Sequence, residues 1–201
     1  MTEVLFTEDE MKIALEKIGD DIAQTLKEKE LCLLDVCLIG LLPNGIHLAK
    51  RLSHYLSIEL GQKIAVGKLD VSLFRDPADT EDHFVSFEKS VIPMELTGKH
   101  VILVDAILFH GKDIRAALEA LLDYGRPSSI ELAILWDRGS RQLPIEPTYT
   151  GLKKSVDSND KYDVLLYESA AQDKIEKQLT GEKVDVENQP ITEAVSQTVS
   201  C

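Results

Sequence analysis

The fold of this 201-residue chain is decided by residues 101–113, which read VILVDAILFHGKD. The apolar run up to Val104 predicts a strand that is buried on both faces, as strands of a parallel sheet are. This strand delivers Asp105 to a turn that contains Gly111, and a helix is expected to begin at Asp113. Because the first turn of a helix offers free backbone N–H groups, the stretch predicts an anion site. The same strand, turn and helix also occur in α/β proteins that bind no phosphate.

The rest of the chain repeats the alternation of strands and helices. Helices are expected over about residues 8–29, where Thr7 and Glu10 form a capping box, and over residues 46–60, which Gly61 ends. Further strands are expected over residues 33–39, 64–74, 130–136 and 164–167. This order predicts an α/β fold with a mostly parallel sheet flanked by helices.

Two segments depart from the alternation. Residues 75–98 have no clean period and are rich in acids, which predicts a long mobile lid loop. Residues 169–201 form a polar, acidic C-terminal tail in which only a short helix over residues 170–179 is expected, followed by disorder. We therefore expect one domain over residues 1–168 and a tail.

Composition excludes several classes of protein. The chain has 22 basic and 35 acidic residues, a net charge of -13, and such a field repels polyanions. The three cysteines, Cys32, Cys37 and Cys201, have neither the spacing of a zinc site nor the even number of a disulfide framework. No segment has the length and apolar character of a membrane span or a signal peptide, so we expect a cytoplasmic protein without a membrane partner.

The candidate site lies where the strands of the sheet end. In open α/β sheets the ligand lies beyond the carboxyl ends of the strands. We therefore expect the turns at residues 40–45, 105–113 and 136–141 to face one crevice.

Residues 101–113 resemble the thirteen-residue phosphoribosyl-pyrophosphate (PRPP) motif of type I phosphoribosyltransferases. Four further stretches, residues 45–52, 73–76, 125–130 and 137–145, resemble pyrimidine operon attenuation regulators that double as uracil phosphoribosyltransferases. The resemblance covers about residues 4–168. It implies the type I phosphoribosyltransferase fold, conversion of uracil and PRPP to UMP and pyrophosphate, usually with magnesium, and binding of a leader RNA by the UMP-loaded protein. It also implies a homodimer.

The chain departs from this family in the PRPP motif. The family has two adjacent acids for the ribose hydroxyls and a Thr-Gly-Arg-Thr loop for the 5′-phosphate. Here Asp105 is followed by Ala106, and the loop reads His110, Gly111, Lys112 and Asp113. A carboxylate accepts hydrogen bonds only and repels phosphate, so we expect Asp113 to cap its helix and fill the anion site itself. Asp105 would be catalytic, and magnesium required, only if the enzyme is active; no cofactor is otherwise expected.

The other family segments give a mixed prediction. The pyrophosphate loop, which has a Thr-Arg pair in the family, reads Leu42, Pro43, Asn44 and Gly45, and proline has no N–H to donate. The lid residues Arg75 and Asp76 and the base-pocket residues Asp137, Arg138 and Arg141 match the family. A structural ion pair between Asp137 and Arg138 is the alternative to a ligand role for those two.

RNA is not an expected partner. Residues 1–31 hold nine acids and four bases, with Glu16 and Asp20 where the family tends to have Thr and His. Binding to RNA phosphates needs clustered Lys and Arg, which this segment lacks.

Three functions are compatible with these residues. The first is a nucleotide-binding or partner-binding homologue, dimeric like its relatives, with weak or no transferase activity and a nucleotide or phosphate ligand. The second is an active uracil phosphoribosyltransferase. The third is a protein-docking module that binds no nucleotide.

Overall fold

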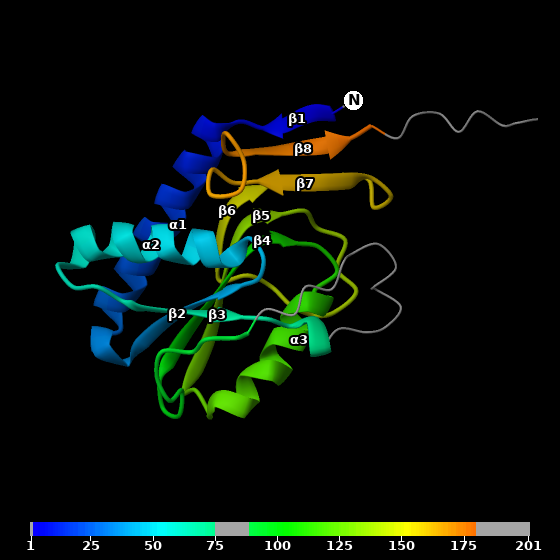
Figure 1. Ribbon diagram of the computed structural model, residues 1–201. Helices are drawn as coiled ribbons and strands as arrows, with labels where there is room; N and C mark the ends of the chain where they lie inside the picture. Colours follow the sequence, from blue (N-terminus) through cyan, green and yellow to red (C-terminus); the bar gives the residue numbers. More distant parts are fainter. Residues whose placement is uncertain (1, 75–88, 180–201) are drawn as a thin grey trace, which may run out of the picture.

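The computed structural model describes residues 2–74 and 89–179 of the chain, and its main sheet has five parallel strands in the order β3-β2-β4-β5-β6 (Figure 1). The strands are β2 (Val36–Leu41), β3 (Ala65–Leu69), β4 (His100–Leu108), β5 (Ser129–Asp137) and β6 (Tyr149–Lys153). The parallel order confirms the expected α/β sheet, although β6 was not among the predicted strands.

Helices cover both faces of this sheet. Helices α1 (Glu8–Glu28) and α2 (Gly45–Leu60) pack on one face, where Leu38 and Val104 point. Helix α3 (Lys112–Leu121) packs on the other, against Ile39 and Leu103. Neighbouring residues of one strand thus enter opposite cores, which explains why β2 and β4 read as continuous apolar runs.

Local signals set the helix ends. The Thr7–Glu10 capping box is present, with the Thr7 backbone N–H donating to Glu10 Oε2 at 2.8 Å. Gly61 ends α2 in the left-handed conformation, with φ 68°, which a residue with a side chain rarely adopts. Both predictions from the sequence are confirmed.

A second, antiparallel sheet of three strands lies beside the main sheet (Figure 1). It has the order β1-β8-β7, with β1 (Thr2–Phe6), β8 (Lys174–Gln178) and β7 (Lys161–Leu165). The short helix expected over residues 170–179 is therefore wrong: this segment is a central strand, bonded to β1 on one side and β7 on the other. Backbone pairing with two distant strands outweighs its local helical preference. The folded part accordingly extends past residue 168.

Three further boundaries differ from the predictions. Leu33–Asp35 is a short 3-10 helix, η1, so β2 begins at Val36. Strand β3 ends at Leu69, and Ser72–Phe74 is another 3-10 helix, η2. The last expected strand, 164–167, is β7, shifted toward the N-terminus and placed in the small sheet.

The segment expected to be a lid lies mostly outside the described residues, which omit 75–88. Its described end, 89–98, packs against the main sheet: Val91 forms an antiparallel bridge with Lys68 of β3, and Leu96 is fully buried. This part is an ordered border of the sheet. Within residues 2–74 and 89–179, no helix combines the length and the apolar character that a membrane crossing requires.

Candidate functional site

A cavity of about 370 Å³ lies where β2 and β4 end, and we call it the strand-end cavity. It is lined by Leu41, Leu42, Pro43, Asn44, Val71, Asp105, Ala106, Ile107, Asp113, Tyr162, Asp163 and Val164. Two of the three predicted turns, 40–45 and 105–113, therefore do face one crevice. The third turn, 136–141, contributes no lining residue.

Strand β4 carries Asp105 and Ala106 into the cavity. The Asp105 carboxylate is half-buried and accepts a 2.7 Å hydrogen bond from the backbone N–H of Ala106. Ala106 is 3% exposed and joins the core on the α1 and α2 side. The side chain of a second acid at position 106 would therefore be placed in a largely apolar environment, which disfavours a charged group.

Helix α3 begins one residue earlier than expected. Gly111 occupies the N-cap position, with φ 90°, and Lys112 is the first helical residue. The expectation that Asp113 caps the helix is wrong, because Asp113 is the second helical residue and its side chain is exposed. Its carboxylate still lines the cavity in the first turn of α3, where the helix dipole stabilises a negative charge.

The loop from β2 to α2 runs very close to β4. A Cβ atom on Gly45 would lie 2.2 Å from the carbonyl oxygen of Val104, and a Cβ atom on Gly40 would lie 2.4 Å from Cα of Ile46. Between them, the Leu42–Pro43 peptide bond is cis. Asn44 occupies the N-cap position of α2 and donates from Nδ2 to the Val164 carbonyl oxygen at 3.3 Å, which connects this loop to the small sheet.

Strand β7 supplies a wall of the cavity that the sequence analysis missed. Tyr162, Asp163 and Val164 face the ends of β2 and β4 across the cavity. No motif in the sequence marks them, because their position depends on how the small sheet meets the main one.

The charged side chains that line the strand-end cavity are all acidic. Asp105, Asp113 and Asp163 contribute carboxylates, and among the described lining residues there is neither Lys nor Arg. Like charges a few ångströms apart repel by about 4 kcal/mol at an effective dielectric constant of about 20. The described walls therefore disfavour a multiply charged phosphate ligand.

The base-pocket residues form a separate cluster beside the cavity. Arg141 donates from Nη2 to Asp137 Oδ1 at 2.7 Å, and its other nitrogens donate to backbone carbonyls that include Phe109 at 3.0 Å and Ile145 at 2.9 Å. Asp137 is 3% exposed and also accepts from the Gly139 N–H. An ion pair is thus present, but it joins Asp137 to Arg141 and not to Arg138.

Arg138 holds the loop that follows β6. Its Nη2 donates to the carbonyl oxygens of Asp157 at 2.8 Å and Asp160 at 3.0 Å. The guanidinium lies 3.9 Å from the ring centre of Phe109 and 5.0 Å from that of Tyr162, so it makes cation–π contacts with two aromatic rings. Burial lowers the pKa of Arg138 from its ordinary value. The predicted lid residues Arg75 and Asp76 lie outside the described residues.

The acid-pair positions of the PRPP motif, which line the strand-end cavity, offer magnesium one carboxylate, that of Asp105. Mg²⁺ takes oxygen ligands in octahedral geometry, commonly one or two carboxylates together with substrate phosphates. Among residues 2–74 and 89–179, no group of three or more His, Cys, Asp or Glu side chains is placed to hold a metal ion. Asp105 offers one carboxylate and Ala106 none, so we derive no step through a metal.

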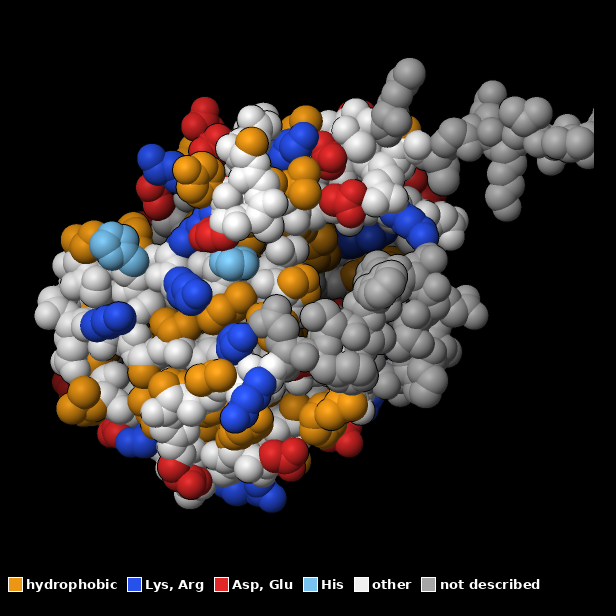
Figure 2. All heavy atoms as spheres, viewed as in Figure 1, with side chains coloured by type: hydrophobic (Ala, Val, Ile, Leu, Met, Phe, Trp, Pro, Cys, Tyr) orange, Lys and Arg blue, Asp and Glu red, His pale blue; other side chains and the backbone are white. Residues whose placement is uncertain are grey.

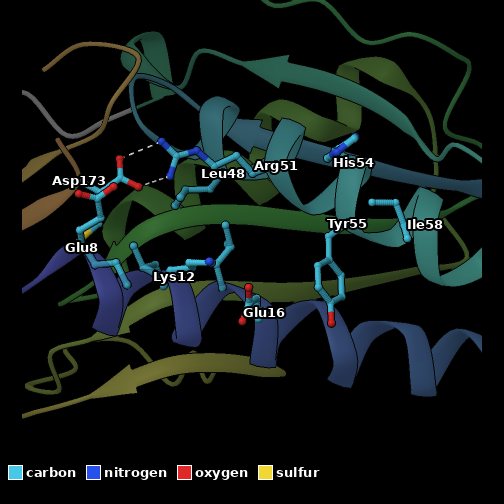
Figure 3. Close-up of a pocket in the computed structure, with 12 residues that line it drawn as sticks. Glu8, Lys12, Glu16, Leu48, Arg51, His54, Tyr55, Ile58 and Asp173 are labelled. Atoms are coloured by element: carbon cyan, nitrogen blue, oxygen red, sulfur yellow. Dashed lines mark hydrogen bonds and ion pairs between the residues drawn. The ribbon is translucent and has the colours of Figure 1, made fainter. Parts of the chain in front are cut away.

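A second cavity, of about 340 Å³, lies between α1 and α2 (Figure 3). Arg51 reaches from α2 toward Asp173, its ion-pair partner in the loop before β8, and Tyr55 points toward α1, where its hydroxyl donates to Asp20. None of the residues carried over from the family motifs as site residues lines this cavity. Its contacts join the two helices and the small sheet.

Comparisons with known proteins agree with the fold described above. A family model described as "Phosphoribosyl transferase domain" matches residues 7–167. The chain is 39% identical over 162 residues to "Bifunctional protein PyrR" of Thermoanaerobacter pseudethanolicus, which covers 81% of this chain and 89% of that protein. It is 38% identical over 172 residues to the protein of the same name from Deinococcus deserti, covering 86% and 92%.

Solved structures with a similar fold include a hypoxanthine-guanine enzyme, "HGPRT-ase from Leishmania tarentolae in complex with GMP". It has a TM-score of 0.65, 16% identity, and coverage of 86% of this chain and 94% of that one. The hypoxanthine phosphoribosyltransferase of Trypanosoma cruzi has a TM-score of 0.58, 18% identity, and coverage of 76% and 82%. At such identities the likeness concerns the fold alone.

Proposed function

Because the chain belongs to the phosphoribosyl transferase family and is similar to PyrR proteins over most of its length, we propose that it is a PyrR-like protein with weak or no transferase activity. In this proposal it acts by binding a nucleotide or a partner at the strand-end cavity. The resemblance to the uracil enzymes defines the reaction it would have lost, the formation of UMP and pyrophosphate from uracil and PRPP.

The observation that carries the proposal is the charge of the strand-end cavity. Three carboxylates and no described Lys or Arg line this cavity, which contains residues of the PRPP motif. The resemblance implies that a phosphorylated sugar would bind there. Transfer from PRPP depends on positioning the substrate and stabilising the leaving pyrophosphate. Ala106 removes one acid of the ribose clamp, Asp113 adds a negative charge, and Pro43 removes a backbone donor from the pyrophosphate loop.

Incubation with PRPP, Mg²⁺ and uracil tests this proposal through the rate of UMP formation. We expect a rate at least tenfold below that of a PyrR relative assayed beside it. A rate within tenfold of the relative would contradict the proposal. Thermal unfolding with a panel of nucleotides then tests binding, because a ligand that binds only the folded state raises the melting temperature. If none of the nucleotides raises the melting temperature, the result would favour a docking module.

An active uracil phosphoribosyltransferase is the second candidate, and two observations favour it. Asp105 lines the cavity, and the loop around Gly45 closely approaches β4. If the chain is active, Asp105→Asn should abolish UMP formation, whereas Asp123→Asn, which alters an exposed acid after α3, should leave it unchanged.

The proposal extends to the partners. We infer a cytoplasmic location from the composition of the chain, a homodimer from the resemblance, and no RNA binding from the acidic first segment of the chain. Sedimentation at several protein concentrations tests the dimer. A filter-binding titration with a leader RNA, with and without UMP, tests the second inference.

A further inference from the structure

A third cavity, of about 480 Å³, lies beside α2 and the edge strand β3, and we call it the Lys50–Lys63 cavity. Lys50, Ser53, His54 and Ser57 come from one face of α2, since residues three and four apart on a helix are neighbours. Lys63, in the turn after α2, and Val66, in β3, complete the lining. The cavity shares no residue with the strand-end cavity, so a ligand bound in it would be independent of the proposed function.

This cavity has the opposite charge to the strand-end cavity. None of its lining residues is acidic. Within the described part of the chain, the side chains of Lys50, His54 and Lys63 form neither an ion pair nor a hydrogen bond. Basic and histidine side chains also gather over α2 and β3 in Figure 2, while acidic ones lie mainly at the borders of that face. In a chain with a net charge of -13, such a surface attracts an anion only locally.

The two serine hydroxyls define what else a ligand must offer. Ser53 donates its only proton to the Ile64 carbonyl oxygen at 2.7 Å, and Ser57 donates its proton to the His54 carbonyl oxygen at 2.7 Å. Their oxygens can therefore only accept further hydrogen bonds. A ligand that satisfies the cavity combines an anionic group for the lysines with hydroxyl donors for the serines.

We propose that the Lys50–Lys63 cavity binds a small phosphomonoester that carries hydroxyl groups. Its phosphate is held by the ammonium groups of Lys50 and Lys63 and by the imidazole of His54, and its hydroxyls donate to Ser57 and Ser53. The volume lies in the range of small-molecule sites. Free phosphate carries the same charge without the hydroxyls, so it should bind more weakly.

The test is a titration of the full chain with glycerol 3-phosphate, followed by amide chemical shifts in NMR spectra. We expect saturable shifts at residues 50–66 that weaken as salt is added. Glycerol should produce none. Lys50→Gln combined with Lys63→Gln should weaken binding about tenfold or more, because two charge contacts are lost. The control combines Lys27→Gln with Lys153→Gln, which removes two exposed lysines from α1 and β6 and should leave binding unchanged.

Several results would overturn the proposal. They are absence of saturable shifts at residues 50–66, equal weakening by the control pair, and binding of glycerol 3-phosphate that is no tighter than binding of inorganic phosphate. Tighter binding of an RNA oligonucleotide at these residues would instead assign the lysines to a nucleic acid. Shifts confined to residues 105–113 would overturn it too, and would separately contradict the charge argument for the strand-end cavity.

Discussion

At the amino ends of β4 and β5, Glu131 is surrounded by groups that bind its carboxylate, whereas at the carboxyl ends Asp105 and Asp113 line an open cavity. Lys29 Nζ lies 2.5 Å from Glu131 Oε1, His100 Nε2 lies 3.1 Å from Oε2, and the Tyr149 hydroxyl also donates to Oε2. The contrast separates two uses of an acid in one sheet. Glu131 joins β4, β5, β6 and α1, while the cavity acids face the space that a ligand would occupy.

The largest effect is expected from Glu131→Ala. Removing the carboxylate leaves His100, Tyr149 and Lys29 without their shared partner, and breaking such a buried cluster costs about 3 kcal/mol. Urea denaturation should therefore give a free energy of unfolding about 3 kcal/mol lower. Glu146→Ala, an exposed control, should stay within about 0.5 kcal/mol. Equal effects of the two changes would show that Glu131 is not structural.

Asp137→Ala tests whether the role of an acid is decided by its hydrogen-bond partners or by the end of the sheet at which it lies. Asp137 lies at the carboxyl end of β5, but it is buried and paired with Arg141. We expect the free energy of unfolding to fall by about 2 kcal/mol, because Arg141 and the Gly139 N–H each lose an acceptor. Asp123→Ala removes an exposed acid after α3 and serves as the control. A loss no larger than that of the control would contradict the structural role.

The double variant Ala106→Asp with Asp113→Thr changes the strand-end cavity toward the family pattern. Removing one carboxylate near the phosphate and completing the acid pair should tighten PRPP binding in the presence of Mg²⁺ about tenfold, or about 1.4 kcal/mol. Isothermal titration calorimetry measures the change. Because Ala106 is buried, Asp113→Thr alone is the companion variant, with Asp123→Thr as its control. Unchanged binding in a folded Asp113→Thr protein would mean that Asp113 does not repel the ligand.

Lowering the pH should also reduce the stability of the fold, in part through the Glu131 cluster. Burial acts to raise the pKa of Glu131, but hydrogen bonds from Lys29 and Tyr149 outweigh it, and the net pKa lies below its ordinary value of 4.5. An acid whose pKa is lower in the folded chain than in the unfolded chain stabilises the fold at pH values above its unfolded pKa. This contribution is lost as the pH falls through the folded pKa. Unfolding between pH 7 and pH 3 should therefore show a smaller loss of stability in Glu131→Gln than in the unmodified chain. Parallel curves would exclude this role of Glu131.

The smallest effect is expected from Asp105→Asn. The amide keeps an oxygen that can accept from the Ala106 N–H, and the side chain is only half-buried. The free energy of unfolding should change by less than about 0.5 kcal/mol. A loss close to that of Glu131→Ala would mean that Asp105, too, is a structural acid and would remove the contrast between the two ends.

Local chemistry explains which parts of the fold could be predicted. The capping box of Thr7 and Glu10, the stop at Gly61 and the apolar run before Asp105 each act over a few neighbouring residues. The small sheet could not be predicted in the same way, because its pairing joins residues 2–6 to residues 174–178. Neither segment alone contains the partner that makes it a strand.

The candidate site divides in the same manner. Asp105 and the loop at Pro43 were placed correctly at the strand ends, since parallel strands bring their carboxyl ends together. The N-cap at Gly111 and the wall formed by Tyr162 could not be read from a motif. The carbonyl contacts of Arg138 and Arg141 depend on how distant loops fold back, which the sequence pattern does not encode.

The most direct test of the account is a PRPP titration of the unmodified chain with Mg²⁺, followed by the amide signals of residues 105–113. The charge of the strand-end cavity predicts no saturable shift of these signals in the unmodified chain. It predicts that a saturable shift appears in a folded Asp113→Thr variant. Saturation at these residues in the unmodified chain, as tight as in a PyrR relative, would contradict the claim that this cavity disfavours a phosphorylated sugar.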